Sequence, residues 1–262
     1  MQKYIDINSD VAESFGAYKM GDDEEVFKYI TSANLACGFH AGDPSVMRYS
    51  VLLAKKLDVA VGAHPGLPDL WGFGRRKLDI TPKEAADYTT YQIGALQAFA
   101  KAEGVDLDHV KFHGVFFTSL VAVDRKLADA VVEAILKINT DLILIGRSSS
   151  ELEESAKRLG LRHAAELAID RARQSNGVAV SRREANAVTT DPIEVADRAE
   201  MIMKEGKMKA IDGKYISIGP ISSFSVHGDN PKALEILKLV RGKLDSIGVK
   251  VRRLKEFYGG TS

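Results

Sequence analysis

The sequence predicts an α/β protein, specifically a closed β/α barrel of about seven parallel strands joined by helices. Short apolar segments of strand length alternate about seven times with longer helical segments, which is typical of a parallel sheet with helical crossovers. About seven or eight such units in roughly 250 residues suit a closed barrel better than an open sheet. The glycine patterns of nucleotide-binding open sheets are absent from the strand-to-helix turns. We therefore expect residues 1–262 to form a single barrel domain, with a doubly wound open sheet as the alternative.

Composition and charge narrow the possible functions. Lys plus Arg and Asp plus Glu both total 36, so the net charge is zero and nothing favours binding to nucleic acid or to an anionic membrane surface. No apolar run is long enough to span a bilayer, and the N-terminus, MQKYIDINSD, lacks a signal-peptide core. The single cysteine, Cys37, excludes an internal disulfide, so we expect a cytoplasmic protein.

The first half of the chain predicts three strands and three helices. A strand at 4–8 ends in the polar run DINSD, and GDD at 21–23 opens a helix to about residue 29. Apolar runs at 30–36 and 59–63 are flanked by glycine, as in strands buried on both faces. Between them, Asp43 and Pro44 predict the N-cap and first residue of a helix that ends near Leu57. Thr81 and Glu84 predict a capping box that opens a helix to about residue 102.

The second half continues the alternation. We expect strands at 110–113, 141–146, 162–169, 215–226 and 249–254, the fourth of them bent at Gly219 and Pro220. Helices are expected at 119–138, 149–159, 192–204 and 231–246. Residues 176–188 are polar and irregular, and we interpret them as an excursion from the repeating pattern.

Reactive side chains stand at the end of almost every predicted strand. In a barrel, the carboxyl ends of the strands meet at one mouth, where ligands bind, so we expect these side chains to converge there. His109 and His163 precede their strands, and we expect them on the opposite face as structural or solvated residues. The residues at the strand ends are Asn8, Asp10, Cys37, His40, His64, His113, Arg147, Glu166, Asp170 and His227.

Two of these imidazoles share a local pattern. HAGDP at His40 and HGDNP at His227 each combine a strand end, a histidine, a glycine turn, a capping residue and a proline. This pattern places an imidazole beside a helix N-terminus, which favours its neutral form and bound anions. A neutral imidazole can act as a base, a hydrogen-bond donor or a metal ligand. We interpret Asp43 and Asp229 as helix caps rather than catalytic groups.

Other notable residues lie near the predicted mouth. In the loop PGLPDLWGFGRR, Arg75 and Arg76 can pair with a substrate carboxylate, although a solvated loop is the alternative. Trp71 and Phe73 form either a lid or simple loop packing. Cys37 is better interpreted as a small buried residue than as a nucleophile, because no partner pattern accompanies it.

Four stretches resemble a known family. They are IDINSDVAESFG at 5–16, TSANLACGFHAGDP at 31–44, GAHPGLPDLWGFGRR at 62–76 and VHGDNP at 226–231. On these motifs the chain resembles the LamB/YcsF family over essentially its whole length. The resemblance implies a seven-stranded barrel of the glycoside hydrolase/deacetylase kind. It also implies ATP-driven hydrolysis of the lactam 5-oxoproline to glutamate, carried out with two further 5-oxoprolinase subunits.

The resemblance also implies a set of mouth residues and marks a region that departs from the family. The second half has KFHGVFFT at 111–118 where the family has KPHGALYN, and AIDRAR at 168–173 where the family has FADRxY. His113, Asp170 and Arg171 are retained, whereas the family's Tyr and Asn are lost. These departures line the same mouth, so they bear on the identity of the substrate more than on the reaction type. The family's mouth residues correspond here to Asp6, Asn8, Asp10, Glu13, Asn34, His40, His64 and His227.

The leading hypothesis is lactam hydrolysis. Asp10 is the candidate general base for the attacking water, oriented by His40 or His64, and another of these histidines or His113 protonates the departing nitrogen. The chain lacks a P-loop, so ATP binds unconventionally or through a partner protein. The catalytic set is Asp10, His40, His64, His113 and His227; the substrate-binding set is Asp6, Asn8, Glu13, Asn34, Arg75, Glu166 and Asp170.

Two alternatives remain open at this point. In one, Asp10, His40 and His64 bind a divalent metal, as in the deacetylases that share this kind of barrel, since a carboxylate and two imidazoles suit zinc and similar ions. The close His-x₃-His spacing typical of such sites is missing, which counts against it. In the other, the chain is a non-catalytic subunit that binds a small molecule, and the altered second half is its only support.

Overall fold

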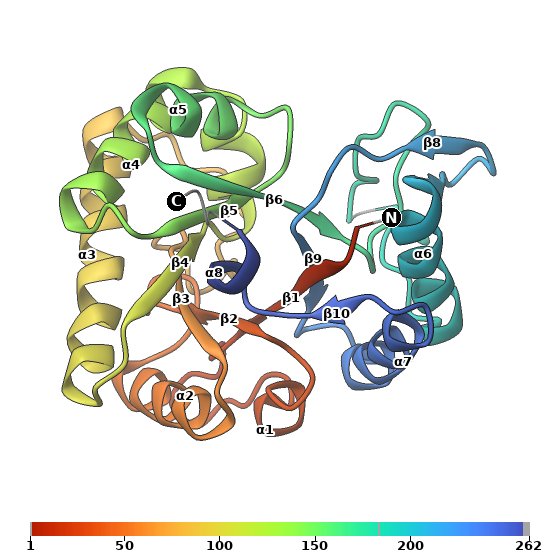
Figure 1. Ribbon diagram of the computed structural model, residues 1–262. Helices are drawn as coiled ribbons and strands as arrows, with labels where there is room; N and C mark the ends of the chain where they lie inside the picture. The colour runs from red at the N-terminus through yellow and green to blue at the C-terminus, as the bar shows by residue number, and fades with distance from the viewer. Residues whose placement is uncertain (1, 183, 259–262) are drawn as a thin grey trace.

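The computed structural model describes residues 2–182 and 184–258 and contains a closed barrel of seven parallel strands (Figure 1). Neighbouring strands pair in chain order, and the last pairs with the first, which closes the barrel. The predicted barrel and its strand number are confirmed. The strands are β1 (Tyr4–Val11), β2 (Ser32–Ala36), β3 (Ala60–His64), β4 (Leu107–Lys111), β5 (Ile143–Gly146), β6 (Arg162–Ala168) and β9 (Ser223–His227).

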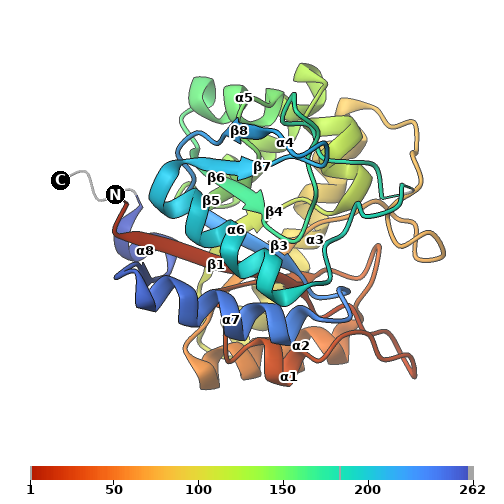
Figure 2. The same ribbon diagram turned by 90° about the vertical axis from the view of Figure 1, so that its right-hand side faces the viewer.

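Helices surround the barrel (Figure 2). Several begin where the sequence predicts: the Asp43 carboxylate accepts hydrogen bonds from the backbone of Ser45 and Val46, and Thr81 and Glu84 form the expected capping box. Among the described residues, no helix is both long and apolar enough to cross a membrane. The helices are α1 (Asp23–Val26), α2 (Pro44–Leu57), α3 (Pro82–Ala102), α4 (Arg125–Ile138), α5 (Glu151–Leu159), α6 (Pro192–Glu205), α7 (Ala233–Ser246) and α8 (Leu254–Phe257).

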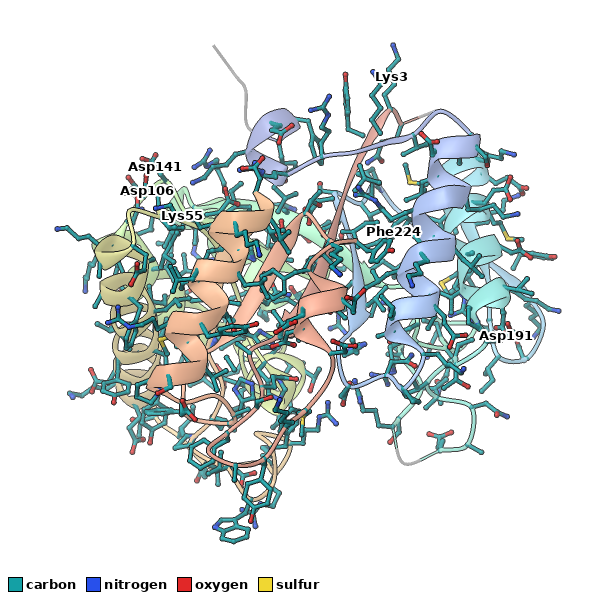
Figure 3. The ribbon with its side chains drawn as sticks, turned by 90° about the horizontal axis from the view of Figure 1, so that it is seen from below. Lys3, Lys55, Asp106, Asp141, Asp191 and Phe224 are labelled. Atoms are coloured by element: carbon teal, nitrogen blue, oxygen red, sulfur yellow. The ribbon has the colours of Figure 1, made fainter. Side chains whose placement is uncertain are left out.

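The apolar core lies between the strands and the helices. Successive residues of a strand point to opposite faces, so Ile5 and Ile7 of β1 face the helices and belong to the main hydrophobic cluster. Phe224 of β9 is fully buried in this layer, whereas Lys55 and Asp141 lie at the edge of the molecule (Figure 3). The alternate positions of β1 point into the barrel, and they are polar.

Two predicted strands differ from the structure. The segment at 215–226 is two strands, of which β8 (Tyr215–Ser217) pairs antiparallel with β7 (Lys207–Lys209) in a hairpin outside the barrel. Gly219 and Pro220 lie between β8 and β9 and end the first of them instead of bending a single strand. The final strand, β10 (Lys250–Val251), pairs with the start of β1 and is not part of the closed ring.

The predicted helix at 119–138 is also two elements. A π-helical segment, η1 (Phe116–Val121), comes first, and α4 starts only at Arg125. The break follows from Asp124, whose carboxylate accepts hydrogen bonds from the backbone of Lys126 and Leu127 at 2.8 and 3.1 Å and so caps a new helix.

Candidate active site

Polar side chains fill the interior of the barrel. Asp6 of β1 accepts hydrogen bonds from Thr31 and Ser32 at 2.7 and 2.6 Å, and it is also bonded by Ser223 of β9. Burial raises the pKa of Asp6, and this effect outweighs the three hydroxyl donors, which lower the pKa. This carboxyl group therefore ties β1 to both of its neighbours in the barrel and lies too deep to act at the mouth.

Lys111 of β4 lies at the centre of this network and was not predicted. Its ammonium group donates to Asp10 at 2.9 Å, Asn8 at 3.1 Å and Ser225 at 2.9 Å, and it lies 3.2 Å from Glu166. Burial lowers the pKa of Lys111, but Asp10 and Glu166 outweigh that effect and hold the pKa above its usual range. A fixed positive charge thus lies between the two carboxylates.

Asp10 lies between this ammonium group and the histidines. Its carboxylate accepts a hydrogen bond from Asn34 at 2.8 Å and lies 3.4 Å from Nε2 of His64. Burial alone would raise the pKa of Asp10. The combined effect of His64 and Lys111 is larger and opposite, so the pKa lies well below its usual range. Asp10 is therefore ionised, and its low pKa makes it a weak proton acceptor.

Three imidazoles and one carboxyl group pack together next to Asp10. The rings of His40 and His113 are stacked, with centroids 3.7 Å apart and an interplanar angle of 5°, and His64 stands perpendicular to both. Nδ1 of His113 lies 3.0 Å from Nε2 of His64, and Nε2 of His40 lies 3.2 Å from Glu13. All four residues are buried and offer possible metal-ligand atoms within 4.8 Å of one another.

The same burial sets the charge of these groups. Burial and the neighbouring histidines hold the pKa of His40 well below its usual range, and burial and His64 do the same for His113. Burial raises the pKa of Glu13 well above its usual range, and Asp10 and Asp229 add to this. In the absence of a bound cation, His40, His113 and Glu13 therefore favour their neutral forms.

Glycines in the β3–α3 loop let its backbone approach these rings. A Cβ at Gly66 would lie 2.3 Å from Nδ1 of His40. Gly74 has a φ of +61°, and a Cβ there would lie 2.8 Å from His40 and 2.9 Å from His113. At both positions a larger residue would collide with a histidine, which explains two of the three glycines of PGLPDLWGFGRR.

His227 and Asp170 form a separate pair at the mouth. Nδ1 of His227 lies 2.8 Å from Asp170, and the backbone N–H of His227 also donates to this carboxylate at 3.2 Å. Burial raises the pKa of Asp170, but His227 and Asn230 outweigh this effect and lower it. The His227 side chain is 17% exposed, in contrast to 0–4% for the other three imidazoles of the mouth. It can therefore meet a ligand from solvent.

Two arginines share one carboxylate beside this pair. Arg75 lies 2.7 Å from Asp229 and Arg182 lies 3.2 Å from the same oxygen, so the group carries one excess positive charge. The Arg75 guanidinium also lies over the Phe73 ring, 4.8 Å from its centroid. Asp229 is therefore an ion-pair partner and not the predicted helix cap, because α7 begins later, at Ala233.

Comparison with known proteins identifies the family. The sequence profile of the LamB/YcsF family matches residues 5–259. The chain belongs to the LamB/YcsF family. A protein from Pyrococcus abyssi, named as the A subunit of 5-oxoprolinase, is 52% identical over 97% of this chain and 99% of its own length. One of the same name from Fusobacterium nucleatum is 46% identical over 98% and 99%.

Solved structures agree with this fold. The lactam utilization protein from Thermus thermophilus superposes with a TM-score of 0.89 at 42% identity, covering 96% of this chain and 99% of that one. A putative cellobiose-phosphate cleavage protein from Enterococcus faecalis shares only the fold, with a TM-score of 0.56 at 13% identity over 98% and 99%. The barrel of the LamB/YcsF family is thus found in chains of very different sequence.

The structure brings most of the predicted LamB/YcsF mouth residues together, with some corrections. His109 does not precede its strand: it lies within β4, and its Nε2 atom is 2.8 Å from Asn34 inside the barrel. His163 also lies within its strand, β6, where it is buried. Trp71 is 96% exposed and does not pack against the loop, whereas Phe73 packs edge-on against His40 and His113. Cys37 is 2% exposed, and burial raises the pKa of its thiol to about 12, in agreement with a small buried residue.

Proposed function

We propose that this chain is the A subunit of a 5-oxoprolinase and hydrolyses the lactam of 5-oxoproline to glutamate. ATP drives the reaction and is bound through two partner subunits. Relatives named as the A subunit of 5-oxoprolinase, at 46–52% identity, support this role. The main structural support is the arrangement of groups at the mouth. The imidazole of His227, oriented by Asp170, lies near the excess positive charge of the arginine pair and near the buried ion network of Lys111.

The charge at the mouth suits the substrate. 5-Oxoproline carries one carboxylate, and the arginines that share Asp229 have one positive charge left to pair with it. We propose that Arg75 and Arg182 orient the substrate through this carboxylate. Its lactam ring then points toward the histidines, where water attacks the carbonyl carbon, the ring C–N bond breaks and the nitrogen takes up a proton.

Proton transfer in this scheme falls to His227. Asp170 accepts the Nδ1–H hydrogen bond of His227, which leaves the Nε2 lone pair to take a proton from water and return it to the departing nitrogen. Asp10, the base expected from the sequence, is held ionised by Lys111 and His64, and its low pKa suits a charge-stabilising role better. Positioned acid–base groups of this kind typically contribute about 10²–10⁴-fold to the rate.

The test is ATP-dependent glutamate release from 5-oxoproline by the assembled three subunits, with and without this chain. We expect release only when all three are present. Asp170→Asn should lower kcat by about 10²–10⁴-fold, because an amide can donate as well as accept and no longer fixes the imidazole tautomer as a carboxylate does. His163→Gln is the matched control, since His163 is a buried histidine outside the mouth, and it should retain turnover.

Two results would contradict the proposal. Tight binding of 5-oxoproline without turnover in the full complex would favour a non-catalytic binding subunit. Turnover that survives Asp170→Asn unchanged would remove His227 from proton transfer.

Metal-dependent amide hydrolysis is the second candidate function, and the specific observation that favours it is the cluster of Glu13, His40, His64 and His113.

A further inference from the structure

The backbone carbonyls around two histidines determine where their protons lie. Nδ1 of His64 is 2.7 Å from the carbonyl oxygen of Lys111, and Nε2 of His113 is 2.9 Å from that of Phe73. A carbonyl oxygen can only accept a hydrogen bond, so each of these two nitrogens carries a proton. In the neutral rings, the remaining nitrogens, Nε2 of His64 and Nδ1 of His113, therefore present lone pairs.

These two lone pairs face each other. The two nitrogens lie 3.0 Å apart, and the rings are at an angle of 89°. Neither nitrogen can donate to the other, so the contact is repulsive unless a positive species lies between them. Two imidazole nitrogens bound at 2.0–2.1 Å to one tetrahedral zinc ion lie about 3.3 Å apart, which is close to the observed separation.

Two carboxyl groups complete the surroundings. Glu13 lies 3.6 Å from Nδ1 of His113, and Asp10 lies 3.4 Å from Nε2 of His64. Ligand atoms of Glu13, His64 and His113 all fall within 4.8 Å of one another. The converging donors are two imidazole nitrogens and carboxylate oxygens, a combination that suits zinc and neighbouring divalent transition metals.

His40 has a different role in this cluster. Its ring is stacked on His113 at 5°, so the two ring planes are parallel and their in-plane lone pairs cannot both point at one ion. Nε2 of His40 instead lies 3.2 Å from Glu13 and can donate a hydrogen bond to it. In that tautomer Nδ1, which is buried without a partner, is an acceptor and not a stranded N–H group.

We propose that Glu13, His64 and His113, with Asp10 beside them, bind one divalent transition-metal ion, and that His40 is a positioning residue that orients Glu13. The set differs from the Asp10, His40 and His64 combination expected from the sequence. His64 and His113 already donate their outer N–H groups to carbonyls, an arrangement that metal-ligating histidines almost always show. A bound ion would supply a Lewis acid at the mouth. The proposal holds whether or not the lactam is the substrate.

The test is metal binding by the whole chain after removal of metals with a chelator. Titration calorimetry with Zn²⁺ should give one saturable site per chain, and Co²⁺ should give an absorption spectrum of nitrogen and oxygen ligands without a thiolate band. Glu13→Gln and His113→Gln should abolish the site. His40→Phe should weaken binding by about 10–100-fold, the usual effect of losing a group that orients a metal ligand, and His40→Gln should restore part of it.

His227→Gln and His163→Gln are the controls, because neither residue belongs to the cluster, and both variants should bind Zn²⁺ as the wild type does. Circular dichroism of each variant separates loss of the site from loss of the fold. The proposal is overturned if the wild type binds no stoichiometric ion, which would leave a shared proton between His64 and His113, or if folded Glu13→Gln and His113→Gln bind normally. Ion binding without lactam hydrolysis would instead overturn the proposed function alone.

Discussion

Replacing Lys111 by methionine tests how far the barrel depends on its buried ion network. The ammonium group lies 2.9 Å from Asp10 and 3.2 Å from Glu166, and all three side chains are at most 11% exposed. At an effective dielectric constant of about 20, each contact contributes about 5–6 kcal/mol of attraction before the cost of desolvation. Methionine keeps most of the volume but leaves two carboxylates without their cation.

We expect Lys111→Met to lower the free energy of unfolding by about 3–5 kcal/mol at neutral pH, the usual cost of removing one partner of a buried ion pair. Such a loss is a large fraction of the roughly 5–15 kcal/mol by which proteins are stable. Urea denaturation followed by circular dichroism measures it. Lys83→Met is the control: Lys83 forms an exposed pair with Asp87 on α3, and the loss there should stay below about 0.5 kcal/mol.

A double variant sharpens the test. In Lys111→Met/Glu166→Gln one carboxylate charge is removed together with the ammonium, so the barrel interior returns to its original net charge. The double variant should therefore be more stable than the sum of the two single losses predicts, by about 1–3 kcal/mol. A cost below about 1 kcal/mol for Lys111→Met, or strict additivity in the double variant, would refute the argument that the network is held by charge.

Three further predictions concern single residues. Gly62→Ala should lower the free energy of unfolding by about 2–4 kcal/mol in urea denaturation, because a Cβ would lie 2.0 Å from Nε2 of His109. Gly94→Ala is the control: it lies on α3 with nothing within 4 Å of its added Cβ and should stabilise the fold by about 0.5–1 kcal/mol. Equal effects of the two substitutions would contradict this reasoning. Cys37, only 2% exposed, should resist alkylation at pH 8.5 in the folded protein and react once urea unfolds it; labelling of the native state followed by mass spectrometry decides this. Burial raises the pKa of Asp23 to about 6, so the folded protein holds this proton more tightly than the unfolded chain. As the pH rises from about 4 to 7, the free energy of unfolding of the wild type should therefore fall by about 1–2 kcal/mol relative to that of Asp23→Asn. This value is reduced because the side chain is partly exposed, and a difference that stays constant with pH would contradict the shift.

The fold was predictable because its signals are local and repeated. The alternation of strand and helix segments follows from chain geometry, and the caps at Asp43 and Thr81 follow from unpaired N–H groups at helix starts. The convergence of the strand-end residues was also predictable, since parallel strands bring their carboxyl ends to one mouth. His40, His64, His113 and His227 were identified in this way.

The interior of the barrel was not predictable by the same reasoning. The sequence pattern predicts that the fourth strand starts at Val110, because an apolar residue usually marks a buried position. In β4, however, His109 and Lys111 point inward to polar partners, so the residues that look solvated are among the most deeply buried. Only the spatial pairing of distant strands shows that each polar group has a partner, and a single sequence does not contain that pairing.

The ion pairs of the mouth escaped prediction for a related reason. Asp229 was interpreted as a cap from its neighbours in the sequence, but its partners Arg75 and Arg182 are 154 and 47 residues away. The hairpin of β7 and β8 was missed because no charged residue separates Tyr215–Ser217 from β9, so the two strands resemble one strand bent at Gly219 and Pro220. For Asp229, long-range contacts determined the outcome over a plausible local signal.

Closure of the barrel has a consequence for how the chain is made. The first strand joins the last, and the bond between Asp6 and Ser223 spans 217 residues. At about 5–20 residues per second, a ribosome needs roughly 10–45 s to supply the second partner after the first. β1 has an open edge throughout that interval, and β6 has one from the time it is made, while the acidic side chains meant for the interior lack their β9 partners. The nascent chain therefore passes through a long period in which it is prone to aggregate, and a truncation before Ser223 removes the closing strand.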